Sequence, residues 1–175
     1  LLSEDRTVLG VNLSVSITRA GVFKLSFALP DGMDVESLTG KTLSHWTELA
    51  ANNQRIVTLH LKGKTEGQAD FAISLVGPGT AGAVAIQAPR LSLIEAGKQT
   101  GQLIVSPEQG MRLQESTSEG LTQLDPKRAG ITQQGALAFR LLQADWSLNF
   151  DVEKVTPWIE AATLQDVTVR EGPLK

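Results

Sequence analysis

Hydrophobic and polar residues alternate along much of this chain. Between positions 11 and 18 every odd residue is aliphatic and every even residue is polar. A period of two is typical of a β-strand that has one face in a core and the other in water. The same alternation recurs at 23–29, 56–61, 71–75, 84–86, 91–93, 103–105, 137–141, 146–152 and 167–169. The pattern therefore predicts many strands.

Links that contain glycine or proline separate these runs. Arg19-Ala20-Gly21 lies between the first two runs and predicts a hairpin turn, and Pro30-Asp31-Gly32 ends the second run. The segments 63–67 and 77–82 are further predicted turns. Glycine accepts positive φ angles and proline fixes φ, so both residues favour turns. Runs and links at this spacing predict an all-β fold, an antiparallel β-sandwich of roughly ten to twelve short strands.

Helical patterns are short in this sequence. Positions 44–51 have a composition compatible with one or two helical turns, and Asp125-Pro126-Lys127-Arg128 would place proline at the first position of a short helix. Neither segment carries a long apolar stripe with a period of 3.6 residues. We therefore expect little helix.

The link at 77–82 also raises the question of one domain or two. It is the most glycine-rich link in the chain, which makes it the best boundary on composition. Neither half carries an obviously separate core, so we predict a single β-sandwich module over residues 1–175. The alternative is two small β-domains split near 77–82.

Composition narrows the class of protein. Hydrophobic residues make up 41% of the chain and charged residues 20%, as in ordinary globular proteins. The net charge of -3 and the pI near 5.4 leave no basic stripe, so no nucleic-acid partner is expected. No apolar run approaches the length of a transmembrane helix. Cysteine is absent, which excludes disulfides, thiolate metal sites and a cysteine nucleophile.

Two strings in the sequence end like a phosphate-binding loop, Gly40-Lys41-Thr42 and Gly63-Lys64-Thr65. Such a loop also needs a glycine five residues before the Gly-Lys pair, so that backbone N–H groups can surround a phosphate. Those positions hold Val35 and Thr58. We therefore interpret both strings as turns, and no nucleotide site is predicted.

The residue types that usually carry catalysis do not form a recognisable motif. His45 and His60 are the only histidines, and without cysteine or a His-x-x-x-His spacing they predict no metal site and no cofactor. No Gly-x-Ser-x-Gly elbow marks a serine nucleophile. Acidic residues gather at 31–36 and 145–153, which we interpret as a solvated turn and a solvated strand face. The chain is predicted not to be an enzyme.

Aromatic residues total 5% and tyrosine is absent. Most of the aromatic side chains share the phase of aliphatic neighbours and are expected in the core. Trp46 and Trp158 are not assigned to any of these runs, and an exposed flat aromatic face is a surface on which sugar rings stack. A glycan-binding accessory domain with Trp46 and Trp158 in its ligand site is therefore one alternative function.

Three segments carry a family resemblance: residues 21–32, Ala88-Pro89-Arg90-Leu91, and 99–105. Their proline- and glycine-introduced strands resemble the β-rich modules of large multi-domain bacterial envelope and surface proteins. The resemblance implies an exported module, in the periplasm or at the cell surface, that contacts other modules of its own chain or another envelope protein. The start at Leu1, without an initiator methionine, is compatible with an origin in a longer protein.

Several predicted strand faces carry serine, threonine, asparagine and glutamine rather than charged residues. Uncharged strand edges can accept another strand unless lysine, proline or a bulge blocks them. We therefore predict a non-enzymatic structural or protein-interaction β-module. A third alternative is a carrier of an apolar ligand, which requires a cavity between the sheets.

Overall fold

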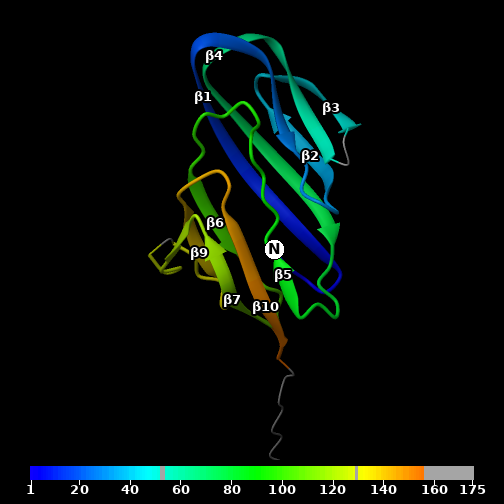
Figure 1. Ribbon diagram of the computed structural model, residues 1–175, viewed down its shortest axis with the longest axis vertical. Coiled ribbons are helices and arrows are strands. Elements are labelled where there is room, and N and C mark those ends of the chain that lie inside the picture. The colour runs from blue at the N-terminus through cyan, green and yellow to red at the C-terminus, as the bar shows by residue number, and fades with distance from the viewer. Residues whose placement is uncertain (52–53, 129, 156–175) are drawn as a thin grey trace, which may run out of the picture.

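The computed structural model describes residues 1–51, 54–128 and 130–155, and these residues form an all-β structure (Figure 1). The strands are β1 (Arg6–Ala28), β2 (Asp34–Gly40), β3 (Leu43–Ala51), β4 (Gln54–Pro78), β5 (Ala85–Gln87), β6 (Gly101–Val105), β7 (Met111–Glu119), β8 (Leu121–Leu124), β9 (Leu137–Leu141) and β10 (Ser147–Lys154). Across the described residues every paired strand is antiparallel. The predicted all-β, antiparallel fold is confirmed. None of the described segments is a helix able to cross a membrane.

The strands form three sheets. In the largest, β4 lies between β1 on one side and both β2 and β3 on the other. The two smaller sheets have the orders β5-β10-β7 and β6-β9-β8. We call β1 to β4 the first lobe and β5 to β10 the second lobe; in Figure 1 β2 and β3 lie in the upper part of the view and β5 and β7 in the lower part.

Strands β1 and β4 are 23 and 25 residues long and pair with each other along most of their length. The sequence predicted a hairpin at 19–21 and a turn at 63–67, and both predictions are wrong. These two segments lie within β1 and β4, opposite one another, where the paired strands arch over together (Figure 1). Two long bent strands therefore replace four of the predicted short ones.

Glycine explains why a bend forms here rather than a turn. The register of β1 against β4 shifts on both sides of Val22, which marks a bulge. Gly21 approaches the other strand so closely that a Cβ atom would lie 2.8 Å from Cγ of Lys64 and 2.7 Å from Cγ of Glu66. Gly67 adopts a φ of 79°, a backbone angle that residues with a Cβ atom rarely adopt. The glycines that suggested turns thus permit a sharp bend in paired strands.

The arch folds the ribbon of β1 and β4 onto itself and encloses the core of the first lobe. Phe27 and Leu59 come from one half of the ribbon and Phe71 and Leu75 from the other, and all four belong to one buried cluster. Their exposed fractions lie between 0% and 3%. Many of the alternating residues predicted for the core faces are therefore buried where the two halves of the ribbon meet, but Phe23 is 63% exposed, so its predicted place in the core is wrong.

The core of the second lobe is a separate cluster. Its largest members are Phe139, Trp146 and Phe150, which come from β9, β10 and the link between them. The rings of Phe139 and Phe150 are tilted by 59° with centroids 6.1 Å apart. Such a tilted arrangement is a favourable packing geometry for aromatic rings.

Two segments cross between the lobes. Leu2 packs in the core of the second lobe, and its backbone N–H donates to the carbonyl of Ser106 at 2.9 Å. In the opposite direction, Leu91 and Leu93 pack in the core of the first lobe. Leu93 forms an isolated bridge with Phe27 instead of the strand that the alternation at 91–93 predicted. These exchanges join the two cores, and the choice between one domain and two stays a prediction.

Both helical suggestions are wrong. Residues 44–51 lie in β3, because pairing with β4 outweighs the local preference of leucine, glutamate and alanine for a helix. Residues 126–128 form a turn, in which the backbone N–H of Lys127 donates to Oδ1 of Asp125 at 3.0 Å. An aspartate that accepts from the backbone two residues later offers the chain an alternative to the helix.

Candidate functional site

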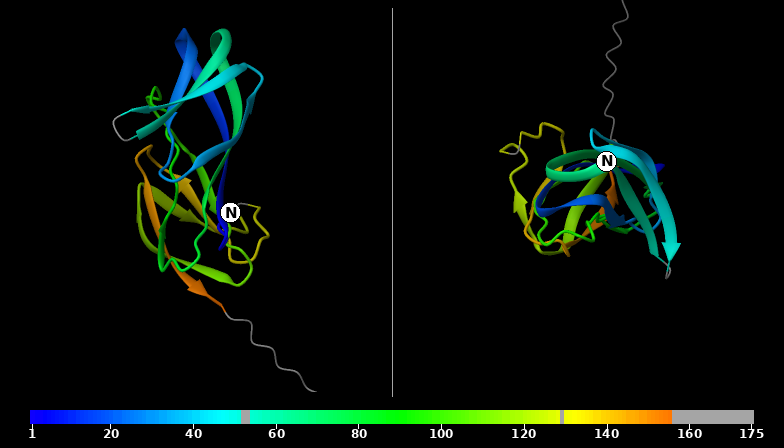
Figure 2. Two further views of the ribbon diagram at one scale, coloured as in Figure 1. Left: turned by 90° about the vertical axis from the view of Figure 1, so that its right-hand side faces the viewer. Right: turned by 90° about the horizontal axis from the view of Figure 1, so that it is seen from above.

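Strand β3 has one paired edge. It runs antiparallel to the first part of β4, from the pair Leu43 and Leu61 to the pair Ala51 and Gln54. Among the described residues no strand pairs with its other edge. Figure 2 shows β3, in cyan, at the outside of the first lobe. Its outer edge therefore presents backbone N–H and C=O groups that another strand can bind.

Strand β3 lies at the margin of the first-lobe core, against which its first residue, Leu43, packs. Every residue from Ser44 to Ala50 is exposed. Trp46 pairs with the buried Leu59 and so lies on the core-side face, where it is 37% exposed. Leu49 lies on the opposite face and is 69% exposed. The strand thus offers a large apolar side chain on each face.

The β3 edge lacks the residues that usually block edge pairing. The strand contains no lysine, arginine or proline, and Glu48 is its only charged residue. Lysine and proline are common devices against unwanted strand addition. The nearby edge of β2 differs, because it carries Asp34 and Glu36. One bulge, between Leu43 and His45, interrupts the pairing of β3 near its start.

Arg55 neutralises the charge of Glu48 and fixes β3 to the rest of the lobe. Its Nε donates to Oε1 of Glu48 at 2.6 Å, and a second guanidinium nitrogen donates to Oδ1 of Asp34 at 2.7 Å. The third nitrogen donates to the carbonyl oxygen of Met33 at 2.9 Å. The hydrogen bonds to Glu48 and then Asp34 raise the pKa of Arg55 above its ordinary range. The clamp leaves the β3 edge without a free charge.

The two histidines come together on this hairpin. His45 of β3 and His60 of β4 are direct cross-strand partners, and their rings stack with centroids 4.5 Å apart and an angle of 6°. Sequence reasoning treated them as separate residues 15 positions apart. Their pairing depends on the register of β3 against β4, which the residues around each histidine do not indicate.

The tryptophans proposed for a glycan site are only partly placed. Trp46 is exposed on β3, as described above, and its neighbour across the strand pair is an aliphatic residue. Trp158 lies outside the described residues. The structure therefore brings no second aromatic ring to Trp46 in the described part of the chain.

A cleft of about 560 Å³ opens between the lobes. Its lining includes Asp31, Arg90 and the buried Trp146, whose indole Nε1 has no hydrogen-bond partner among the described residues. No histidine is among the residues that line it. The cleft thus lacks the imidazole base that usually activates a serine nucleophile.

The other predicted motifs have structural roles. Gly40-Lys41-Thr42 forms the turn between β2 and β3, and Gly63-Lys64-Thr65 lies within β4. In the acidic groups, Asp34 binds Arg55 and Glu36 accepts a hydrogen bond from Ser74. Within residues 1–51, 54–128 and 130–155, no three acidic, histidine or cysteine side chains are placed to hold a metal ion together.

No protein-family model matches the chain, and a comparison with curated proteins finds no relative.

Proposed function

We propose that this chain is a non-enzymatic interaction module that binds an extended segment of a partner at the open edge of β3. One observation carries the proposal: β3 is an edge strand without blocking charges that exposes Trp46 and Leu49 on its two faces. A strand of this kind in isolation is a liability for aggregation, and a partner strand removes the liability.

The geometry of β3 defines the chemistry of the partner. An added strand forms main-chain hydrogen bonds with the edge, and these give affinity for any extended chain. Side chains beside Trp46 and Leu49 give selectivity, so the partner segment carries apolar residues on both of its faces. Because Glu48 is already bound by Arg55, the partner needs no matching charge at the centre of the contact.

The resemblance to envelope modules supports a particular source for this segment. Modules of such proteins pack against their neighbours, so we infer that the segment belongs to another module of the same chain or to another envelope protein. This proposal includes export to the periplasm or cell surface.

A peptide selection tests the proposal without knowledge of the natural partner. Nine-residue peptides are selected against the purified chain from a random display library, and the enriched peptides are measured by calorimetry and by hydrogen exchange. We expect apolar, extended peptides that slow amide exchange in β3 and β4. Enrichment of peptides that protect other strands, or of none, would contradict the proposal.

A matched pair of variants assigns the site. Leu49→Lys places a blocking charge on the β3 edge, and we expect the affinity of the selected peptides to fall by about tenfold or more, because lysine disfavours strand addition. Leu142→Lys makes the same change at an exposed leucine of the second lobe, 56% exposed, and should leave peptide affinity unchanged. Equal losses in the two variants would point to a general effect of charge.

The other two functions are separated by parallel measurements. The glycan hypothesis rests on Trp46 and Trp158 and predicts a change in tryptophan fluorescence with some member of a polysaccharide panel. The apolar-carrier hypothesis predicts a ligand that co-purifies with the chain and is visible by native mass spectrometry. A negative result in both assays, together with peptide binding at β3, would favour the interaction module.

A further inference from the structure

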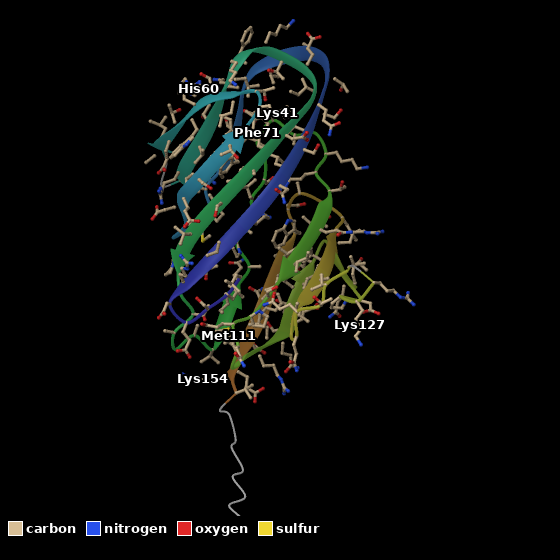
Figure 3. All side chains as sticks on the ribbon, turned by 180° about the vertical axis from the view of Figure 1, so that it is seen from behind. Lys41, His60, Phe71, Met111, Lys127 and Lys154 are labelled. Carbon is tan, nitrogen blue, oxygen red and sulfur yellow. The ribbon has the colours of Figure 1, made fainter. Side chains whose placement is uncertain are left out.

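We propose that His45 and His60 form a binding site for one divalent transition-metal ion, a function separate from the binding of a partner strand. The two residues face each other across the β3–β4 pair with ring centroids 4.5 Å apart. In Figure 3 His60 lies toward the opposite end of the molecule from Lys154, on the outer part of the first lobe. Imidazole nitrogen is a preferred ligand of Cu²⁺, Zn²⁺ and Ni²⁺.

Hydroxyl groups already orient both rings. Nε2 of His60 and Oγ1 of Thr47 are 2.9 Å apart and share a hydrogen bond. Nδ1 of His45 and Oγ of Ser44 are 3.3 Å apart. Metal-binding histidines commonly use one ring nitrogen for the metal and the other for a hydrogen bond that fixes the ring. Here each ring has one nitrogen engaged in this way, which assigns Nδ1 of His60 and Nε2 of His45 to the metal.

The stacked rings need a modest movement to bind a metal. In parallel rings the ligand lone pairs run side by side, whereas ligation requires them to converge on an ion about 2.0–2.1 Å from each nitrogen. His45 is exposed on the edge strand, so its ring can rotate without displacing any core residue. The backbone of the pair is fixed by the β3–β4 register, and a chelating pair held this way loses little freedom on binding.

The charged residues nearest the histidine pair affect how strongly it can hold a metal ion. Lys24 of β1 is the cross-strand neighbour of His60, and Lys62 follows two positions later on β4. Nζ of Lys62 donates to the carbonyl of Lys41 at 2.9 Å, which holds this charge in a hydrogen bond. No acidic side chain joins the two histidines in a three-ligand group among the described residues. The site therefore holds its ion through two imidazoles and water, and favours Cu²⁺, the strongest of these ions toward nitrogen ligands.

The composition of the chain makes the test unusually clean. With two histidines and no cysteine, imidazole and thiolate ligands occur nowhere else. We would titrate the untagged chain with CuCl₂ and, separately, ZnCl₂ in a buffer that does not bind metal, and measure heat and stoichiometry. One ion per chain is expected, with tighter binding of Cu²⁺ than of Zn²⁺.

Single substitutions identify the ligands. We expect His45→Gln and His60→Gln each to abolish stoichiometric binding, and Thr47→Val to weaken it by about 10- to 100-fold through loss of the orienting hydrogen bond. Glu36→Gln removes an exposed acid from β2 and serves as the control that should bind like the wild type. We expect each variant to fold, because the substituted side chains lie outside the two buried cores. Circular dichroism checks that it does.

Nuclear magnetic resonance supplies a second readout. Sub-stoichiometric Cu²⁺ should broaden the imidazole resonances of both histidines before those of any other residue. Three results would overturn the proposal: no saturable binding by the wild type, binding that persists in either histidine variant, or broadening confined to acidic residues. The last two would identify adventitious binding by carboxylates or by the amino terminus.

Discussion

In the first lobe two strands of 23 and 25 residues supply most of the buried core, whereas the strands of the second lobe are 3 to 9 residues long. On each side of the arch, β1 and β4 pair with each other in a single continuous register. A slip by one residue would turn every core side chain toward water, so this register is strongly specified. In the second lobe each register covers only short strands, and the core includes a few large side chains such as Phe150 and Trp146.

The same difference separates the surfaces of the two lobes. The bent ribbon of the first lobe leaves β3 at the margin of the core, and residues 44–50 of that strand are exposed. Both candidate sites, the β3 edge and the histidine pair, lie where β3 pairs with the first part of β4. A core built from one long ribbon therefore leaves a strand at its margin, where its edge and its side chains can bind a partner or a ligand.

The strongest test of this comparison removes one core aromatic from each lobe. Phe27→Ala and Phe150→Ala each delete a fully buried side chain and should each cost about 3–5 kcal/mol of unfolding free energy. We expect Phe27→Ala to speed amide exchange first in β4 and Phe150→Ala first in β7. Denaturant unfolding and hydrogen exchange measure both effects. Equal acceleration in both lobes by either variant would show one cooperative unit, joined by Leu2, Leu91 and Leu93.

Sequence alternation located the core faces of the long strands well. Phe27, Leu59 and Leu75 were in the predicted phase and are all fully buried. Alternation reports burial on one side of a strand, so it works wherever a strand has one covered face. It could not separate a hairpin at 19–21 from a bend, because both leave the flanking runs in phase and both use glycine.

The candidate sites were less accessible to sequence reasoning. Trp46 was identified because its phase matched no core run, and the structure places it on an exposed strand. The exposure of all of 44–50 was missed, since these residues have the composition of a short helix and pairing with β4 decides their structure. The histidine pair depends on register, which the local composition around His45 does not reveal.

Gly79 tests the junction where the chain leaves the first lobe. A Cβ atom at this position would collide with the backbone of Glu4, which is the segment that carries Leu2 into the second lobe. We expect Gly79→Ala to lower the unfolding free energy by about 1–3 kcal/mol, the usual cost of overpacking. Gly63→Ala is the control, because nothing lies within 4 Å of its Cβ position. If both variants unfold at the same denaturant concentration, the close approach at 79 has no energetic importance.

A substitution of Arg55 tests how firmly β3 is held to the rest of the first lobe. Arg55→Met keeps the apolar part of the side chain and removes the hydrogen bonds to Glu48, Asp34 and the carbonyl of Met33. We expect faster amide exchange in β3, little change in the second lobe, and a smaller difference from wild type at high salt, which screens exposed ion pairs. Glu36→Gln, an acid of β2 outside this clamp, should leave β3 exchange unchanged. Faster exchange in β10 with Arg55→Met would mean that the clamp supports both lobes.

The smallest predicted effect concerns a polar pair on the outer face of the ribbon. Oγ of Ser14 donates to Oδ1 of Asp70 at 2.7 Å, and the hydrogen bonds from Ser14 and then Gln68 lower the pKa of Asp70. A carboxyl whose pKa is lower in the folded state stabilises the fold above its unfolded pKa, about 3.9, and this contribution is lost as the pH falls through the folded pKa.

Ser14→Ala should therefore raise the pKa of Asp70 toward its ordinary value and reduce stability at neutral pH more than at strongly acidic pH. A carboxyl titration by nuclear magnetic resonance measures the first effect, and thermal unfolding at several pH values measures the second. Ser16→Ala, at the next outward position of β1, is the matched control and should change neither. A loss of stability that is the same at all pH values would assign Ser14 to packing rather than to the charge of Asp70. Because this pair lies on the ribbon away from the second lobe's core, its loss should leave the exchange of β7 and β10 unaltered, which again separates the two lobes.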